Sequence, residues 1–282
     1  MTNTPPDYLV IGHLTQDLLP DGSVAPGGTV FYGALTATRL GYSAGMLTAA
    51  AGWAAVPPEI QVVSVPSAAS STFAHAYVDG QRQQLVHAVA APISAEQLPQ
   101  PWRHAPIVHL GPVLDECAEA LIDAFPGALL GVTPQGWMRR VDGPLPAPMR
   151  PLPWRPAPEL LRRIDLLVLS VEDVQGDEDV VADYAHHCGC VALTRGADGV
   201  TLYVSGVPRH IPASPAQALD TNGAGDIFAA AMLLQLFETG DPAQAARFAA
   251  AMAAVAVEGR GAEAIPTRAG VIRRMRGEDG RR

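Results

Sequence analysis

The sequence predicts an α/β protein built on a largely parallel β-sheet with helices as crossovers. Short apolar runs of strand length alternate with longer helical patterns along the chain, which is typical of parallel strands joined by helices. Apolar residues make up 48% of the 282 residues, enough for one large domain with its own packed core. We therefore expect residues 1–282 to form a single α/β domain.

The individual elements follow from the apolar runs. The first strand is expected at Tyr8–Gly12, and a helical pattern then covers Thr29–Leu40 and ends at Gly41. Further strands are expected at Ser43–Leu47, Gln61–Val65, Ile107–Leu110, Leu129–Val132, Leu166–Leu169 and Val191–Thr194. Helices are expected at Glu116–Phe125, Ala157–Ile164, Asp179–Cys188, Ala224–Glu238 and Pro242–Glu258.

Two segments depart from this alternation. Leu18–Val24 contains a Pro-Asp-Gly turn, and the strand-like runs Thr72–Val78 and Gln84–Val89 flank Asp79-Gly80, a strong hairpin signal. Both predict small antiparallel additions to the main sheet, near residues 14–27 and 71–92. Because they are far apart in sequence, we expect one lid assembled from two excursions.

The segment 136–158 is rich in proline and cannot form a regular helix. It is either a flexible linker between domains or an ordered irregular crossover. Strand-like runs of the same kind occur on both sides of it, which favours the crossover.

Composition excludes several classes of function. The net charge of −9 argues against a broad basic face for nucleic acid. The three cysteines, Cys117, Cys188 and Cys190, fit neither a disulfide framework nor a zinc pattern. Met1–Pro6 lacks the features of a secretory signal, and the longest apolar stretch, Phe248–Val257, is too short for a membrane span. We expect a cytoplasmic protein without nucleic-acid or membrane partners.

One segment carries the chemistry: Asp220-Thr221-Asn222-Gly223-Ala224-Gly225-Asp226, directly before an apolar helix. Small residues at a helix start leave backbone N–H groups open, and these form an anion site with the positive end of the helix dipole. Asp226 lies in the first turn beside that site. Phosphoryl transfer to an alcohol needs such a base and such donors.

A structural interpretation competes with this one. A lone Asp at a helix start is commonly a carboxylate stabilised by the dipole, and glycines commonly make a tight turn. Here both occur together behind Asp220 and Thr221, and the combination favours the functional interpretation.

The segment resembles the D-T-x-G-A-G-D signature of the ribokinase-like (pfkB-type) carbohydrate kinases, with all six specified positions matching. Pro26-Gly27-Gly28 before a helix resembles the substrate loop of that family. Thr194-Arg195-Gly196-Ala197-Asp198-Gly199 resembles its T-x-G-x-x-G nucleotide loop, and Gly261–Pro266 resembles the stretch that closes over the adenine.

The resemblance implies a three-layer sandwich with a mostly parallel central sheet between helices, plus a small β lid over the acceptor. It also implies roles. Asp226 would be the catalytic base, and Gly223, Ala224 and Gly225 the anion hole. ATP would lie against Thr194, Gly196, Gly199, Asp220 and Thr221. The acceptor would lie against Asp17, Gly27, Gly28, Tyr32, Gln135 and Arg139.

Three departures from the family pattern matter. The family carries N-x-x-E for magnesium, whereas this chain has Ser170-Val171-Glu172-Asp173, so Asp173 is expected to help Mg²⁺ through water. Phe31-Tyr32 stands where many members have Asn. The lid is expected to be short, so closure is either incomplete or needs a partner chain; family members often dimerise through the lid. A monovalent cation is a further cofactor to consider.

The segment Gln135–Arg140 follows the strand expected at Leu129–Val132 and resembles plant myo-inositol kinases. It is either a surface loop with solvated arginines or part of the acceptor site. His13 and His109, which follow or end strands, are either structural or at the edge of that site. His186-His187 near Cys188 suits a helix C-terminus better than a metal site.

These observations predict an ATP-dependent kinase acting on a hydroxyl of a small neutral sugar or polyol, with a myo-inositol-like acceptor favoured. The alternatives are a nucleoside kinase of the same fold and a catalytically silent small-molecule-binding homologue. A nicotinamide dehydrogenase is excluded because no strand leads into a G-x-G-x-x-G turn.

Overall fold

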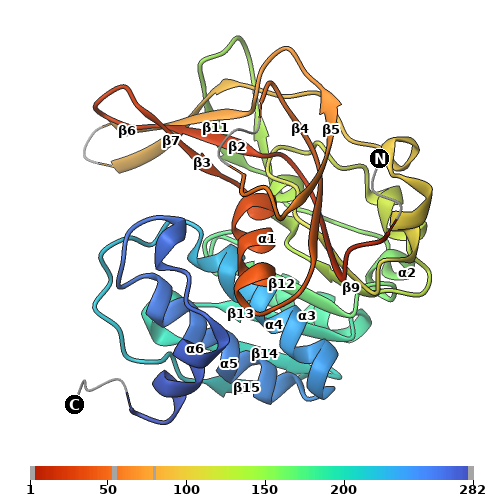
Figure 1. The fold of residues 1–282 in the computed structure, drawn as a ribbon, viewed down its shortest axis with the longest axis vertical. Helices are drawn as coiled ribbons and strands as arrows, with labels where there is room; N and C mark the ends of the chain where they lie inside the picture. The colour runs from red at the N-terminus through yellow and green to blue at the C-terminus, as the bar shows by residue number, and fades with distance from the viewer. Residues whose placement is uncertain (1–3, 53–55, 79–80, 279–282) are drawn as a thin grey trace.

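The computed structural model describes residues 4–52, 56–78 and 81–278, and the side chains of residues 75–83 lie outside that description. The predicted hairpin turn Asp79-Gly80 therefore falls outside the described residues. The described chain folds into two sheets of unequal size, with helices on both faces of the larger one (Figure 1).

The main sheet has nine strands in the order β15-β14-β13-β12-β9-β8-β1-β4-β5. The strands from β13 to β5 run parallel, and only the β14–β15 hairpin at one edge is antiparallel. Their bounds are β1 Tyr8–Ile11, β4 Ala44–Ala50, β5 Gln61–Pro66, β8 Ile107–Leu110, β9 Leu129–Val132, β12 Leu166–Ser170, β13 Cys190–Thr194, β14 Val200–Val204 and β15 Val207–Ile211.

Alternate residues of these strands face two separate cores, as the period of a β-strand requires. On one face Tyr8 and Val10 of β1 pack with α1 (Thr29–Arg39), α4 (Ala224–Thr239), α5 (Pro242–Ala256) and α6 (Arg268–Met275). On the other face Leu9 and Ile11 pack with α2 (Pro158–Leu161), α3 (Glu178–His187) and short 3₁₀ turns. The predicted three-layer sandwich is confirmed.

Two of the predicted helices are shorter or tighter than the sequence suggested. Glu116–Phe125 contains a 3₁₀ helix at Glu119–Ala124, and Ala157–Ile164 contains only the four-residue α2. The Glu116 carboxylate accepts hydrogen bonds from the amides of Val113 and Leu114. These bonds hold residues 113–116 in a loop, so the helical turns begin only at Glu119.

The second sheet has six strands in the order β10-β11-β7-β6-β2-β3 and lies at the top of Figure 1, beyond the N-terminal end of α1. It is antiparallel except between β2 and β6. We call it the lid sheet. Its strands are β2 Thr15–Leu18, β3 Val24–Gly27, β6 Thr72–Val78, β7 Gln81–Ala88, β10 Arg139–Val141 and β11 Ala147–Pro151.

The lid sheet corrects two expectations. The excursions near residues 14–27 and 71–92 form a sheet of their own instead of additions to the main sheet. The proline-rich segment 136–158 is not an irregular crossover, because it supplies β10 and β11, so the lid is larger than expected. Pro148 pairs with Leu85 of β7 and Pro151 ends its strand, positions at which proline interrupts few ladder bonds.

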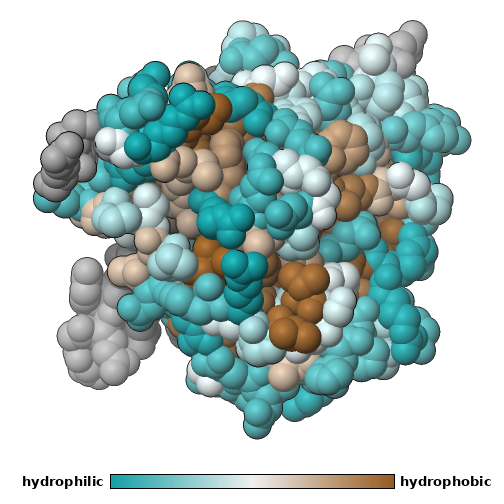
Figure 2. Space-filling model, turned by 90° about the horizontal axis from the view of Figure 1, so that it is seen from below, coloured by the Kyte–Doolittle hydropathy of each residue, from teal (hydrophilic) through white to brown (hydrophobic). Residues whose placement is uncertain are grey.

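Figure 2 shows the face of the molecule opposite the lid sheet. Hydrophilic residues cover most of it, and apolar residues occur in small separate groups. The described residues contain no helix long and apolar enough to cross a membrane.

Candidate active site

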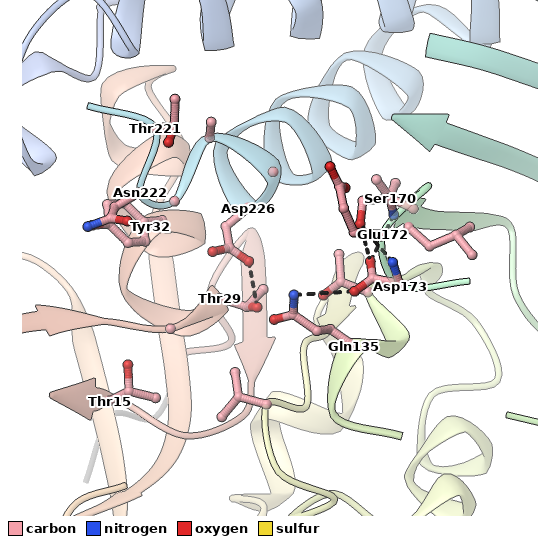
Figure 3. Close-up of a pocket in the computed structure, with 18 of the residues that line it drawn as sticks. Thr15, Thr29, Tyr32, Gln135, Ser170, Glu172, Asp173, Thr221, Asn222 and Asp226 are labelled. Carbon is pink, nitrogen blue, oxygen red and sulfur yellow. Dashed lines mark hydrogen bonds between the residues drawn. The ribbon is translucent and has the colours of Figure 1, made fainter. Parts of the chain in front are cut away.

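A cavity of about 520 Å³ lies where the carboxyl ends of the main-sheet strands meet the lid sheet and the start of α4 (Figure 3). This is where open parallel sheets commonly bind ligands. The lid contributes Thr15, Asp17, Phe73, Gln84 and Arg139, and α1 contributes Gly28, Thr29 and Tyr32. The strand ends and α4 contribute Val113, Thr133, Gln135, Val168, Leu169, Ser170, Glu172, Asp173, Thr194 and residues 221–226.

The start of α4 has an open N-terminus. Gly223 is the N-cap residue with φ 72°, and no side chain caps the helix. A Cβ on Gly223 would lie 2.5 Å from the ring of Tyr32, so glycine is required both by the backbone angle and by the close approach. The amide of Ala224 donates to the carbonyl of Thr221 at 3.2 Å, and this narrows the candidate anion donors to the amides of Gly223 and Gly225.

Asp226 lies in the first turn of α4 and points into the cavity (Figure 3). Its Oδ1 accepts a hydrogen bond from the Thr29 hydroxyl at 2.7 Å. Burial raises the pKa of the Asp226 carboxyl to about 6, while the Thr29 hydrogen bond and the charge of Arg139 act in the opposite direction. A carboxylate with this pKa is ionised at neutral pH and basic enough to take a proton from a bound hydroxyl.

Arg139, at the start of β10, is the one cationic side chain among the described residues that line the cavity. Its Nε donates to the carbonyl of Gln135 and its Nη1 to Gln84 Oε1, both at 3.2 Å. Burial lowers the pKa of its guanidinium to about 10, against the charges of Asp173, Asp226 and Glu116. The side chain therefore stays charged at neutral pH inside the cavity.

The segment after β12 presents two carboxylates. Asp173 Oδ2 accepts from the amide and the hydroxyl of Ser170 at 2.8 and 2.9 Å, and its Oδ1 accepts from Gln135 Nε2 at 3.4 Å (Figure 3). Asp173 thus stabilises its own turn. Glu172 lines the same cavity with a more exposed side chain, although the sequence analysis assigned it no role.

Magnesium fits this place on the chemistry of the donors. Mg²⁺ is typically held by one or two carboxylates together with substrate phosphates and water, and Glu172 and Asp173 would supply the carboxylates. The described residues contain no group of three or more His, Cys, Asp or Glu side chains arranged to hold a metal.

The residues predicted for the acceptor meet at the lid side of the cavity. Asp17, Gly28, Tyr32, Gln135 and Arg139 all line it. Gly27 does not, but a Cβ there would lie 3.0 Å from Thr15 Oγ1 and 3.2 Å from Asp17, so it leaves room for those side chains. Phe31 is only 5% exposed and packs in the core with Tyr32, so of the Phe31-Tyr32 pair only Tyr32 lines the cavity.

The residues predicted for the nucleotide are divided. Thr194 and Thr221 line the cavity, whereas Gly196, Gly199 and Asp220 do not. A Cβ on Gly199 would lie 2.3 Å from the carbonyl oxygen of Ile211, which is a structural reason for that glycine. Asp220 accepts from the amides of Asn222 and Gly261, both at 3.0 Å, and thereby joins the signature segment to the stretch that begins at Gly261.

Both candidate histidines have structural partners. His13 contacts the Ser71 hydroxyl and the Ala91 carbonyl, so it joins the points where the chain enters and leaves the lid. His109 Nδ1 lies 2.6 Å from the Tyr8 hydroxyl, and burial lowers its pKa to about 3. The three cysteines are buried and free.

Sequence reasoning missed several residues that line the cavity. Thr29 and Glu172 each stand directly beside a predicted site residue, so adjacency was the available signal. Thr133 follows β9, and position at a strand end was its signal. Asn222 also stands beside predicted site residues, between Thr221 and Gly223. Thr15 and Gln84 reach the cavity through tertiary structure that no local pattern reveals.

Comparison with known proteins relates part of the chain to one family of kinases. Residues 164–268 match the model of the pfkB family carbohydrate kinases. A ribokinase of Haemophilus influenzae is 35% identical over 123 residues, which cover 39% of this chain and 40% of that protein. The bifunctional protein HldE of Caulobacter sp. is 35% identical over 88 residues, 31% of this chain and 18% of that protein. The chain thus spans less than half the length of these curated relatives.

Solved structures show the same fold over nearly the whole chain. A pyrophosphate-dependent kinase of the ribokinase family, complexed with a pyrophosphate analog and myo-inositol, has a TM-score of 0.77 at 20% identity, covering 94% of this chain and 98% of that one. The ribokinase of Arabidopsis thaliana, complexed with ribose and ATP, has a TM-score of 0.72 at 21% identity, covering 96% and 99%. Residues 164–268 therefore match the pfkB family carbohydrate kinases, and the chain shares the fold of these ribokinase-family structures.

Proposed function

We propose that the protein transfers a phosphoryl group to a hydroxyl of a small neutral sugar or polyol. The observation that carries this proposal is the placement of the Asp226 carboxylate beside the open amides of Gly223 and Gly225, inside a cavity that also receives Asp17 and Arg139. Asp226 takes the proton of the acceptor hydroxyl, and the amides and Arg139 stabilise the charge of the migrating phosphoryl group.

A neutral acceptor is favoured by the charges of the cavity. Four carboxylates line it, from Asp17, Glu172, Asp173 and Asp226, against the single guanidinium of Arg139. Carboxylates accept hydrogen bonds from vicinal hydroxyls and repel a phosphate already present on the sugar. Arg139 is already shared between Gln84 and the Gln135 carbonyl, which leaves little cationic capacity for a second phosphate.

Among neutral acceptors we favour a myo-inositol-like polyol. Tyr32, Asp17 and Gln135 line the same cavity, and an aromatic ring with polar groups around it suits a cyclic acceptor with several hydroxyls. One solved neighbour of this fold holds myo-inositol, which supports the choice by likeness of fold. A nucleoside or a simple sugar is the runner-up, because the same aromatic ring suits a base or a furanose ring.

ATP, with magnesium, is the donor that the Thr194 loop favours. A second donor, pyrophosphate, is favoured by one observation: Thr194 and Thr221 line the cavity, whereas Gly196, Gly199 and residues 261–266 do not. A donor without a nucleoside needs a site for its phosphates alone and no contact with those residues. A cytoplasmic location remains an expectation from the sequence composition. A homodimer joined through the lid and a monovalent cation remain expectations from the family resemblance.

The test is a matrix of acceptors and donors with the purified protein. Inositols, ribose, fructose, nucleosides and fructose phosphates are each offered with ATP or with pyrophosphate over a range of magnesium concentrations, and phosphorylated product is followed by ³¹P NMR. We expect the highest kcat/KM on a neutral polyol. Turnover on phosphorylated sugars alone would overturn the neutral acceptor, and no transfer under any condition would favour the silent binding protein.

A further inference from the structure

Thr29 is the first residue of α1 and contacts the carboxylate of Asp226 across 197 positions of sequence. Its hydroxyl donates to Asp226 Oδ1 at 2.7 Å, and its side chain is only 3% exposed. In Figure 3 the bonded oxygen of Asp226 points toward Thr29, and the second oxygen points away from it into the cavity. The two oxygens of the carboxylate therefore have different surroundings.

We propose that Thr29 is a positioning residue for the phosphoryl transfer: its hydroxyl fixes Oδ1 of Asp226 so that Oδ2 faces the acceptor hydroxyl. This inference rests on the proposed function of the same site. In the step, the acceptor O–H gives its proton to Oδ2 and its oxygen forms a bond to phosphorus. The bond from phosphorus to the leaving phosphate oxygen breaks, and Asp226 later releases the proton to water.

The local structure holds the Thr29 side chain in place. Gly28 precedes it with φ 88°, and a Cβ on Gly28 would lie 2.5 Å from the carbonyl oxygen of His13. On the other side Gly111 leaves room for Thr29, because a Cβ there would lie 2.3 Å from Thr29 Cγ2. A β-branched side chain has few rotamers, and these contacts leave its hydroxyl directed at Asp226.

Other charged and titratable groups also act on Asp226. Arg139 of β10 favours the ionised carboxylate, Asp173 after β12 disfavours it, and Tyr8 of β1 and Tyr32 of α1 are close enough to sense its charge. The Thr29 hydroxyl differs from these groups because it donates a hydrogen bond to one oxygen of the carboxylate, Oδ1. Removal of that donor disfavours the ionised carboxylate and frees it to rotate.

The chain offers a matched set of variants. Thr29→Val keeps the shape and removes the hydroxyl, whereas Thr29→Ser keeps the hydroxyl. Thr36→Val is the control: Thr36 is a fully buried threonine on the same helix, and its hydroxyl has no hydrogen-bond partner among the described residues.

The experiment has one readout that needs no turnover. Protein labelled with [4-¹³C]aspartate is titrated by NMR, and the resonance of Asp226 is assigned by its loss in Asp226→Asn. A hydrogen bond to a charged group is worth about one to two pH units, so we expect the Asp226 midpoint to rise by about one unit or more in Thr29→Val. Thr29→Ser and Thr36→Val should keep the wild-type midpoint.

The second readout is the pH profile of the proposed reaction. In Thr29→Val we expect kcat to fall roughly tenfold or more, with the acid limb moved to higher pH and KM for the acceptor little changed. An unchanged Asp226 midpoint in Thr29→Val, or a loss of activity that Thr29→Ser does not restore, overturns the inference. Absence of transfer by the wild-type protein instead overturns the proposed function, so the two failures are distinguishable.

Discussion

The two sides of the cavity differ in how regular they are. The side that holds Asp226, Ser170 and Thr194 is built from parallel strands and one long apolar helix, and it lies within the segment 164–268 that matches the family model. The side that holds Asp17, Gln84 and Arg139 is the lid sheet, assembled from three separate excursions of the chain. All of its strands lie outside residues 164–268.

Under the proposed function, this difference separates the groups that carry out phosphoryl transfer from the groups that select the acceptor. The regular side presents a base and open amides, which phosphoryl transfer needs whatever the acceptor. The lid side presents Asp17 and Gln84, which are proposed to face the acceptor. Loops and small sheets on a rigid scaffold vary more easily than the scaffold does. Changes on the regular side should therefore affect turnover, and changes on the lid side should affect which acceptor is used.

The largest effect is expected for Asp226→Asn on the regular side. Loss of a positioned base typically lowers the rate roughly 10²–10⁴-fold, and kcat should fall by this amount while donor binding, measured by calorimetry, persists. In the wild type kcat/KM should fall as the pH drops below about 6, where Asp226 becomes protonated. A variant with near wild-type turnover would remove Asp226 from the mechanism.

The same substitution should stabilise the fold. The pKa of Asp226 is raised from 3.8 to about 6 by burial, so the folded state loses stability as the pH rises from about 4 through 6. The full loss is about 3 kcal/mol. The Asp226→Asn variant carries no ionisable group at this position and does not lose this stability. Its Tm should therefore exceed that of the wild type at pH 7.5, and the difference in Tm should disappear toward pH 4. A lower Tm for the variant at pH 7.5 would contradict this account.

The next largest effect is expected for Arg139→Met, which is the exception on the lid side because its charge acts on Asp226. Removing a donor to developing charge costs roughly 10² in kcat, and loss of the guanidinium should also raise the pKa of Asp226 and move the acid limb upward. Arg140→Met is the matched control, because Arg140 is exposed, pairs with Asp142 and does not line the active-site cavity. Equal losses in both variants would indicate a general effect on the lid.

The regular side was also the more predictable one from sequence. β12 and β13 begin and end within one residue of the predicted bounds, and α4 begins within the signature, because strand and helix periods and a helix start are local properties. The lid depends on pairings between distant segments, such as Ala147 with Val86. No periodicity within Ala147–Pro151 indicates that partner, so a proline-rich stretch was not recognised as strands.

A smaller effect is expected for Asp17→Asn on the lid side. Asp17 lines the cavity from β2, and a hydrogen bond to its charge should contribute roughly tenfold to acceptor affinity. KM for a neutral polyol should rise by about this factor, and discrimination against phosphorylated sugars should weaken because one repelling charge is lost. Asp21→Asn in the exposed turn of the same hairpin is the control. A fall in kcat without a change in KM would place Asp17 with the catalytic groups instead.

The candidate site was predictable only where its residues are neighbours in the sequence. Gly223, Gly225 and Asp226 occur in one short segment, so their proximity needs no knowledge of the fold. The Thr29–Asp226 hydrogen bond joins two segments that only the packing of α1 beside α4 brings together. In the predicted nucleotide loop, a match to a sequence motif did not predict position. Gly196 and Gly199 fit the motif but do not line the cavity.

The smallest effect, and the one that tests the donor, is expected for Gly196→Ala. Gly196 has φ 55° and nothing within 4 Å of an added Cβ, so alanine brings backbone strain of about 1–2 kcal/mol but no clash. Gly206→Ala is the matched control, with φ 76° in the β14–β15 turn and only the Ala185 carbonyl near, at 3.9 Å. Both variants should lose similar stability in thermal melts. If a nucleoside lies over the Gly196 turn, only Gly196→Ala should raise KM for ATP, by a few-fold, and KM for pyrophosphate should stay unchanged in both. If the ATP constants of Gly196→Ala equal those of Gly206→Ala, the donor does not extend beyond Thr194, and the regular side recognises phosphates alone.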